Sequence, residues 1–232
     1  MIRTTTSLLS MLSLMVWLPA NPIFADTGKV TGVTDVILTF DPGDGSEPVV
    51  VLAQDPDGAG EAGLQVQGPI NLSESTSYVL GINVLNSIAM ENLTTEILSK
   101  GTEYQYFFAF TEGVFQSPSG NGNIDNASDQ LAYADEDAQG RPIGHITSWT
   151  SACVDGDVSG TFRLVLKHQP GEKSDESGVE NGETIFDLTF DISVTEDPNA
   201  PPCENEEEVI DKVTLTFTPS GGGTPVVAVA SD

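Results

Sequence analysis

The sequence predicts an all-β protein: an antiparallel β-sandwich of the immunoglobulin-like kind with one short helix, followed by the first hairpin of a second, incomplete repeat. Two observations predict this fold. Apolar side chains recur at every second residue in most segments, which is the period of a strand with one buried face. The segments between them are rich in Gly, Asp, Asn and Pro, which end strands and form turns. Eight or nine short strands divided by such turns are typical of two packed antiparallel sheets.

The first 25 residues are expected to be a secretory signal peptide and not part of the fold. Arg3 is followed by an apolar run from Leu8 to Leu18, and the segment ends at Ala25 before an acidic residue. The run is shorter than the roughly 20 residues of a membrane span, so cleavage after Ala25 is favoured over an uncleaved anchor. No later run is long enough to cross a bilayer, so no transmembrane segment is expected after signal removal. The protein is therefore expected to be exported, either periplasmic or extracellular.

The sandwich is predicted to occupy residues 26–196, and its strands follow the alternation in chain order. The expected strands are 36–40, 49–54, 78–84, 103–110, 130–134, 143–149, 161–167 and 184–194. In the last, Phe186, Leu188 and Phe190 alternate with polar residues, which predicts one buried face and one acidic face. Residues 92–101 are the one helical candidate, with Asn92 as its N-cap and Gly101 closing it.

The end of the chain repeats its beginning. Residues 197–208 are rich in Pro and acidic residues, which predicts a linker, and residues 209–232 match residues 32–55 at 11 of 24 positions. A single hairpin is rarely stable alone in water. Two explanations remain open. Residues 209–232 either begin the second domain of a longer tandem array, or form a hairpin that is donated to a neighbouring copy.

The charge balance limits the classes of partner. The chain has 35 acidic and 8 basic residues, a net charge of −27. Such a surface repels phosphate groups, so nucleic acid and anionic lipid are not expected as partners. It attracts cations, calcium among them. Solubility, or adaptation to salty surroundings, explains the same charge and is the favoured interpretation.

The segment "DEDAQG" has the most suggestive spacing of oxygen ligands. Asp135, Asp137 and Gln139 stand at positions one, three and five, with Gly140 at six, as in the first half of a calcium loop. Ile146 stands where the twelfth-position glutamate would be, which favours a plain hairpin loop. Asp55 and Asp57 form a second candidate pair. Weak Ca²⁺ binding is the only cofactor expected.

The chemistry-bearing residues indicate a disulfide and no catalytic site. An exported chain with two cysteines fits one bridge, Cys153–Cys203, although free thiols or links between chains remain open. The sequence contains no nucleophile, zinc or phosphate-binding motif, which predicts that it is not an enzyme. A carboxylate-dependent glycosidase remains the third possibility, because spacing in space is not visible in a sequence. Trp149 is the best candidate for an exposed binding aromatic.

Several segments resemble a known group of proteins. They are "NLTTEILSKGTEYQYFF", "YADEDAQGRPIG", "GTFRLVLKHQPGEKS", "GETIFDLTFDISV" and "EEEVIDKVTLTFTPSGGGTPV". They resemble uncharacterised small exported lipoproteins of Bacteroidetes-type bacteria, over most of residues 30–196 and again from Glu206. Some members are encoded near TonB-dependent receptors, so the resemblance implies the cell envelope and nutrient uptake. This chain departs from the group because it lacks a lipid-attachment cysteine after the signal and carries a second domain start.

The expected function is that of a non-enzymatic exported β-sandwich module with a structural or interaction role in the cell envelope or at the surface. Its expected partners are other envelope or surface proteins, or copies of itself bound through the C-terminal hairpin. The alternative is a periplasmic ligand-binding accessory to an outer-membrane uptake receptor. A concave pocket lined by Trp149, or by the strand that holds Tyr104 and Tyr106, would favour that alternative.

Overall fold

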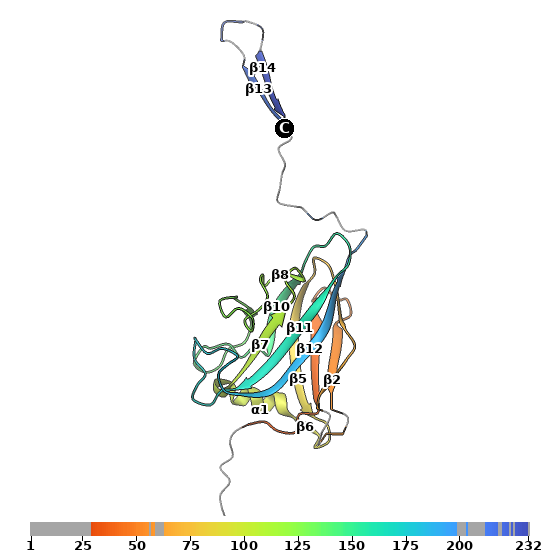
Figure 1. The fold of residues 1–232 in the computed structure, drawn as a ribbon, viewed down its shortest axis with the longest axis vertical. Helices are drawn as coiled ribbons and strands as arrows, with labels where there is room; N and C mark the ends of the chain where they lie inside the picture. The colour runs from red at the N-terminus through yellow and green to blue at the C-terminus, as the bar shows by residue number, and fades with distance from the viewer. Residues whose placement is uncertain are drawn as a thin grey trace, which may run out of the picture.

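The computed structural model describes residues 29–55, 57–58, 63–198, 203, 212–217, 220–222, 224 and 226–231. The chain forms a β-sandwich of two sheets with one short α-helix at one end (Figure 1), as the sequence predicts. The predicted signal peptide lies outside the described residues, and so does most of the predicted linker.

The larger sheet is antiparallel and has the strand order β3-β2-β1-β5-β10-β8, with β6 beside β5 and β9 beside β10. Its strands are β1 (Asp35–Asp41), β2 (Val49–Gln54), β3 (Gln65–Gln67), β5 (Ser77–Asn86), β6 (Glu91–Asn92), β8 (Phe115–Ser117), β9 (Ala132–Tyr133) and β10 (Ile146–Ser151). The predicted strands at 130–134 and 143–149 are thus shorter or shifted. The short strands β3, β6 and β8 have too few residues for a visible alternation.

The smaller sheet has the order β4-β12-β11-β7. Its strands are β4 (Ile70–Ser73), β7 (Tyr104–Phe110), β11 (Val158–His168) and β12 (Glu183–Thr195). β4 pairs with β12 in parallel, over Ile192 to Thr195 only, so this sheet is mixed and not purely antiparallel as expected. The chain passes from the larger sheet to the smaller one between β3 and β4, at Gly68 and Pro69, and it reaches β12 running in the same direction.

The helix forms where the sequence predicts it but ends differently. α1 (Leu93–Ser99) is capped by the Asn92 side chain, which accepts a hydrogen bond from the Thr94 N–H at 3.1 Å. Lys100 is the C-cap, and Gly101 begins a short 3₁₀-helix, η1 (Gly101–Glu103), instead of closing α1. Leu93 and Ile97 are buried, so α1 covers one end of the core.

The interior is filled by aromatic side chains around Trp149. This side chain is only 2% exposed, and its ring lies 4.7 to 5.5 Å from those of Phe108, Phe110, Phe115 and Phe162. Trp149 is therefore a core residue, and the expectation that it is an exposed binding aromatic is wrong. Such edge-to-face rings stabilise the packing between the two sheets.

β7 is buried on both faces, although its sequence predicts one buried face. Tyr104, Tyr106 and Phe108 point into the core as expected. Gln105 and Phe107, on the other face, are also buried, and they line a hollow whose other walls come from the loops at residues 127–133 and 175–178. The loops thus add a partial third layer over the edge of the smaller sheet.

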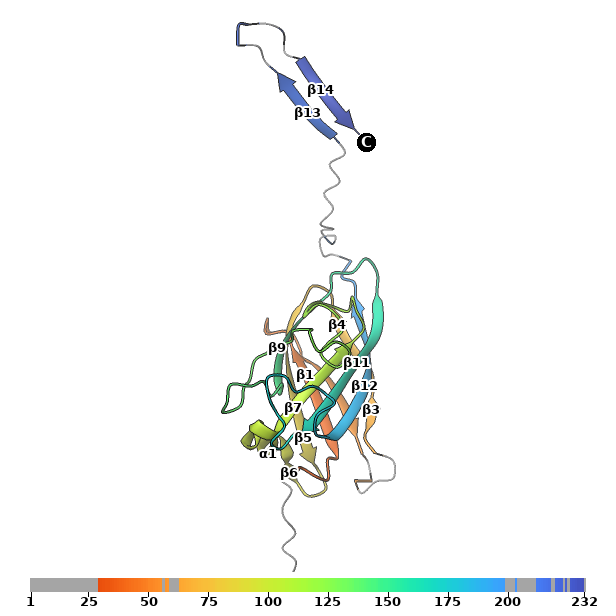
Figure 2. The ribbon, with the colours of Figure 1, turned by 60° about the vertical axis from the view of Figure 1, so that its left-hand side comes forward.

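The end of the chain forms the predicted hairpin. β13 (Lys212–Phe217) pairs with β14 (Val226–Ser231), and Lys212 lies opposite Ser231 just as Asp35 lies opposite Gln54 in the β1–β2 hairpin. The offset of 177 residues holds for every pair of that ladder. In both views the hairpin lies apart from the sandwich (Figures 1 and 2).

None of the helices in the described part of the chain has the length and apolar character that a membrane crossing requires.

Candidate functional site

The "DEDAQG" segment is a tight loop whose carboxylates bind its own backbone. Asp135 accepts hydrogen bonds from the N–H groups of Gly144 at 2.9 Å and His145 at 3.1 Å, one on each oxygen. Oδ1 of Asp137 accepts from the N–H groups of Gln139 at 2.8 Å and Arg141 at 3.0 Å. These bonds use oxygens that a calcium ion would need, so the two carboxylates support the loop from within.

The remaining oxygen of Asp137 faces a lysine. Nζ of Lys173 lies 3.0 Å from Asp137 Oδ2 and donates to the carbonyl of Gly101 at 2.7 Å, and neither charged side chain is exposed. Burial would raise the pKa of Asp137, but the hydrogen bonds from the Arg141 amide and from Lys173 hold that pKa below its usual value. Burial lowers the pKa of Lys173, against the attraction of Asp137. A calcium ion here would have to displace this ammonium group.

Asp55 and Asp57 lie at the end of β2, beside a different part of the sandwich. Asp55 is 9% exposed, and its Oδ1 accepts from the N–H groups of Asp57 at 3.3 Å and Gly58 at 3.1 Å. A hydrogen bond between the two carboxyl groups raises the pKa of Asp57. Asp57 is exposed, so this pair keeps a carboxyl group that solvent cations can reach. Calcium binding here stays a prediction.

Cys153 and Cys203 form a disulfide with a Cα–Cα distance of 5.6 Å. Beside it, the buried carboxylate of Glu74 accepts hydrogen bonds from the N–H groups of Val154 at 3.1 Å and Asp197 at 2.7 Å. The three side chains are close enough to suggest a metal site, but both sulfurs are bonded to each other. The bridge and Glu74 instead hold the start of the predicted linker against the domain.

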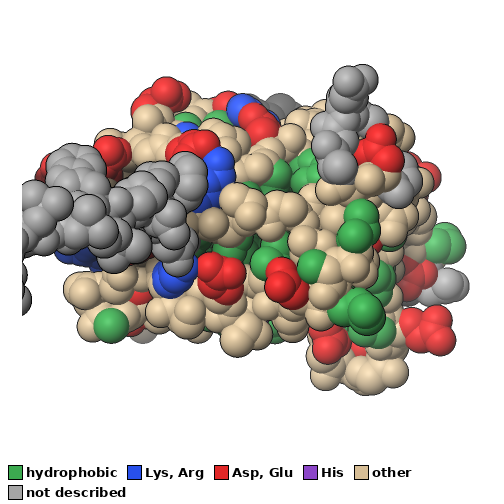
Figure 3. Space-filling model, turned by 90° about the horizontal axis from the view of Figure 1, so that it is seen from below, with side chains coloured by type: hydrophobic (Ala, Val, Ile, Leu, Met, Phe, Trp, Pro, Cys, Tyr) green, Lys and Arg blue, Asp and Glu red, His purple; other side chains and the backbone are tan. Residues whose placement is uncertain are grey.

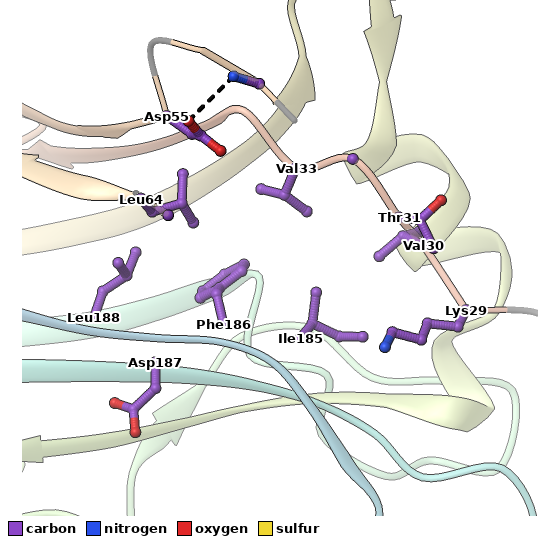
Figure 4. Close-up of a pocket in the computed structure, with 13 residues that line it drawn as sticks. Lys29, Val30, Thr31, Val33, Asp55, Leu64, Ile185, Phe186, Asp187 and Leu188 are labelled. Carbon is purple, nitrogen blue, oxygen red and sulfur yellow. Dashed lines mark hydrogen bonds between the residues drawn. The ribbon is translucent and has the colours of Figure 1, made fainter. Parts of the chain in front are cut away.

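A groove of about 560 Å³ lies between the two sheets at the lower end of the molecule. Its walls are the segment Lys29–Val33, the turn after β2 and the first half of β12. Leu64, Val33 and Phe186 point toward a common space in Figure 4. Hydrophobic side chains are visible in this hollow, with acidic side chains along its rim (Figure 3). An ion pair between Lys29 and Glu183 closes one end.

The groove runs along the edge of a strand. Ile185, Phe186, Asp187 and Leu188 all line it, although successive side chains of a strand point to opposite faces. Ile185 is the extra residue of a β-bulge opposite Leu166 and Lys167, and the Asp187 side chain points away from the groove in Figure 4, so the groove reaches Asp187 along the backbone of β12. β12 pairs with β11 along one side, and its other side meets β4 only from Ile192 onward. Within the described part of the chain, no strand pairs with Glu183–Asp191 on that side.

Sequence reasoning did not find this groove, because an unpaired strand edge depends on where a distant strand docks. The alternation of β12 is regular from Phe186 to Val194, after a β-bulge at Ile185, and it does not show that β4 covers only four residues of this strand. The one local signal is the Gly68–Pro69 step, which separates β3 from β4.

Comparison of the chain with protein-family models, with curated proteins and with solved structures finds no match. The resemblance described above therefore stays an expectation.

Proposed function

We propose that this protein is a non-enzymatic, exported β-sandwich module with a structural or interaction role in the cell envelope or at the surface. The observation that carries the proposal is the exposed edge of β12 with its apolar groove. Exposed strand edges are sites where proteins add a strand from a partner. The acidic side chains that the sequence singled out at residues 135–137 support a loop, and the aromatic residues fill the core.

Export is supported by the sequence of the first 25 residues and by the disulfide, which is typical of oxidising compartments. A disulfide between residues 50 positions apart also suits a domain that must stay folded outside the cell.

The second candidate function is that of a ligand-binding accessory to an uptake receptor. The groove favours it, because its volume falls within the roughly 300–1,000 Å³ of small-molecule sites. The pocket that would have favoured it on sequence grounds is not formed, since Trp149, Tyr104 and Tyr106 are buried in the core.

Two measurements on cells that express the full chain test the proposal. The mature protein should begin at Asp26, carry an oxidised cysteine pair and remain with the washed envelope or surface fraction. Ile185→Asp places a charge in the groove and should release the protein, whereas Val50→Asp, on the outer face of the larger sheet where Val50 is 59% exposed, should not.

Native mass spectrometry of the purified protein separates the two candidates. A bound small molecule that Ile185→Asp removes would favour the accessory function over the module. An unprocessed chain that stays in the cytoplasm would contradict both.

A further inference from the structure

The free edge of β12 is long enough to accept another strand. Glu183–Asp191 spans about 25–30 Å of extended backbone, whereas β13 and β14 have six residues each, or about 20 Å. The groove beside this edge has apolar side chains on both of its walls, Leu64 on one and Ile185 of β12 on the other. Strand addition joins main-chain hydrogen bonds along such an edge to side-chain contacts in the adjoining hollows.

The charge of the edge selects the kind of strand that can bind there. Glu183, Asp187 and Asp191 lie along the free half of β12, where Glu183 pairs with Lys29 and Asp187 pairs with Arg163. A strand with acidic side chains would bring a like charge close to Asp191. Asp211 and Asp232 flank the C-terminal hairpin, but its two strands, Lys212–Phe217 and Val226–Ser231, contain Lys212 and no acidic residue. The strands of the C-terminal hairpin therefore bring no like charge to Asp191.

The C-terminal hairpin also has strand edges at which it could pair with another strand. β13 and β14 pair only with each other among the described strands, so each has one side without a partner. In the β1–β2 hairpin, which has the same register, the corresponding sides pair with β5 and β3. The C-terminal hairpin lies apart from its own sandwich (Figure 2), which leaves its edges open to another molecule.

We propose that the free edge of β12 and its groove accept the C-terminal hairpin of a second copy of this chain by strand addition. This inference rests on the interaction role proposed above and names the partner. No strand of the accepting sandwich is displaced, because β1 and β2 keep their neighbours. Each copy has one hairpin and one groove on different parts of its surface, so the contact joins copies head to tail.

Sedimentation velocity of the oxidised full chain, from micromolar to millimolar concentration, tests the inference. The wild type should associate as its concentration rises. Ile185→Asp, in the groove, and Val227→Asp, on β14 where Val227 is 55% exposed, should each weaken association by about tenfold or more, because a carboxylate is buried in the contact. Val50→Asp should associate as the wild type does.

Mixing the two defective variants gives a sharper test. Ile185→Asp keeps a normal hairpin, and Val227→Asp keeps a normal groove. A head-to-tail contact therefore predicts that the mixture forms dimers but no longer chains, which variants that had merely misfolded would not do. Failure of the mixture to form dimers would overturn the inference, as would equal weakening by Val50→Asp or a wild type that stays monomeric.

Hydrogen exchange identifies the source of the hairpin. Because β12 already pairs with β11, the test concerns the Glu183–Asp191 amides that point away from β11, whose protection should appear only as concentration rises. Protection in a dilute monomer would show that the hairpin docks on its own sandwich and would overturn the inference. A wild type that stays monomeric, while Ile185→Asp still releases the protein from the envelope, would overturn this inference alone and leave the proposed interaction role standing.

Discussion

Nζ of Lys173 lies 3.0 Å from Oδ2 of Asp137 with neither side chain exposed to solvent. The same ammonium group donates to the carbonyl of Gly101, at the start of η1. One buried cation thus joins three segments that are far apart in the sequence: the loop at residues 135–140, η1, and the turn after β11. This part of the fold therefore depends on a charge pair as well as on the apolar packing of Ile143 beside Gly101.

Asp137→Asn should lower the free energy of unfolding by about 3–5 kcal/mol, because it leaves the buried Lys173 without its counter-charge. Urea denaturation measures the loss. Asp175→Asn is the matched control: that carboxylate is 89% exposed and lies 3.7 Å from Arg141, so its removal should change little. Recovery of the Asp137→Asn variant by added calcium would contradict the structural role assigned to this residue.

The contribution of Asp137 should depend on pH. Its pKa is lower in the folded chain than the ordinary 3.8, so its ionisation stabilises the fold above that value. The stabilisation is lost as the pH falls through the lower folded-state pKa. The difference in unfolding free energy between the wild type and Asp137→Asn should therefore be constant above about pH 5 and shrink toward pH 2. A difference that stays constant over the whole range would count against this assignment.

Removal of the disulfide should destabilise the whole domain. The bridge closes a loop of 50 residues that contains β11 and β12, so the chain-entropy estimate for Cys153→Ser with Cys203→Ser is a loss of about 4 kcal/mol. Chemical denaturation of the double variant, beside the oxidised wild type, measures it. Equal stability of the two proteins would mean that the bridge constrains only the segment near Cys203.

Trp149 should report on the core. The only other tryptophan, Trp17, lies in the predicted signal peptide, so the mature protein would fluoresce from Trp149 alone. Because this side chain is 2% exposed, acrylamide should quench it poorly, and Trp149→Ala should cost about 3–5 kcal/mol, with Trp149→Phe costing less. Strong quenching in the native protein would place Trp149 at the surface and revive its role as a binding residue.

Asp57→Asn should raise the melting temperature at neutral pH. The hydrogen bond to Asp55 raises the pKa of Asp57, so ionisation of this group opposes folding as the pH rises through the folded-state value. Millimolar calcium should raise the melting temperature of the wild type, because a cation offsets the same repulsion, and should have less effect on the variant. If calcium shifts neither protein, the prediction of weak calcium binding is wrong.

The alternation of apolar residues predicted the long strands, since their inner faces are covered by a sheet along their whole length. In β12, Phe186, Leu188 and Phe190 are buried as expected. β3 and β4 were missed because three or four residues are too few for a pattern, and the parallel pairing of β4 follows from a crossover that no local pattern records.

For the site residues, too, local spacing predicted part of the arrangement, and contacts with distant residues decided the rest. The acidic loop at residues 135–140 was identified from its spacing, but its partner Lys173 lies 36 residues away in a turn without periodicity. Local spacing indicates which residues share a loop and not which distant side chain faces them. Trp149 was misplaced for a related reason: its burial comes from four aromatic rings on other strands.

The bridge between Cys153 and Cys203 also decides how the domain would bear mechanical tension. The chain enters at the end near η1, where the Val30 N–H donates to the Tyr104 hydroxyl, and it leaves at the opposite end, beside the start of β11 (Figure 1). A pull on the C-terminal tail passes from Cys203 through the disulfide to Cys153 and on to β10, so β11 and β12 lie outside the covalent path of the load. The ladder between these two strands is therefore not peeled apart one hydrogen bond at a time from the end of β12.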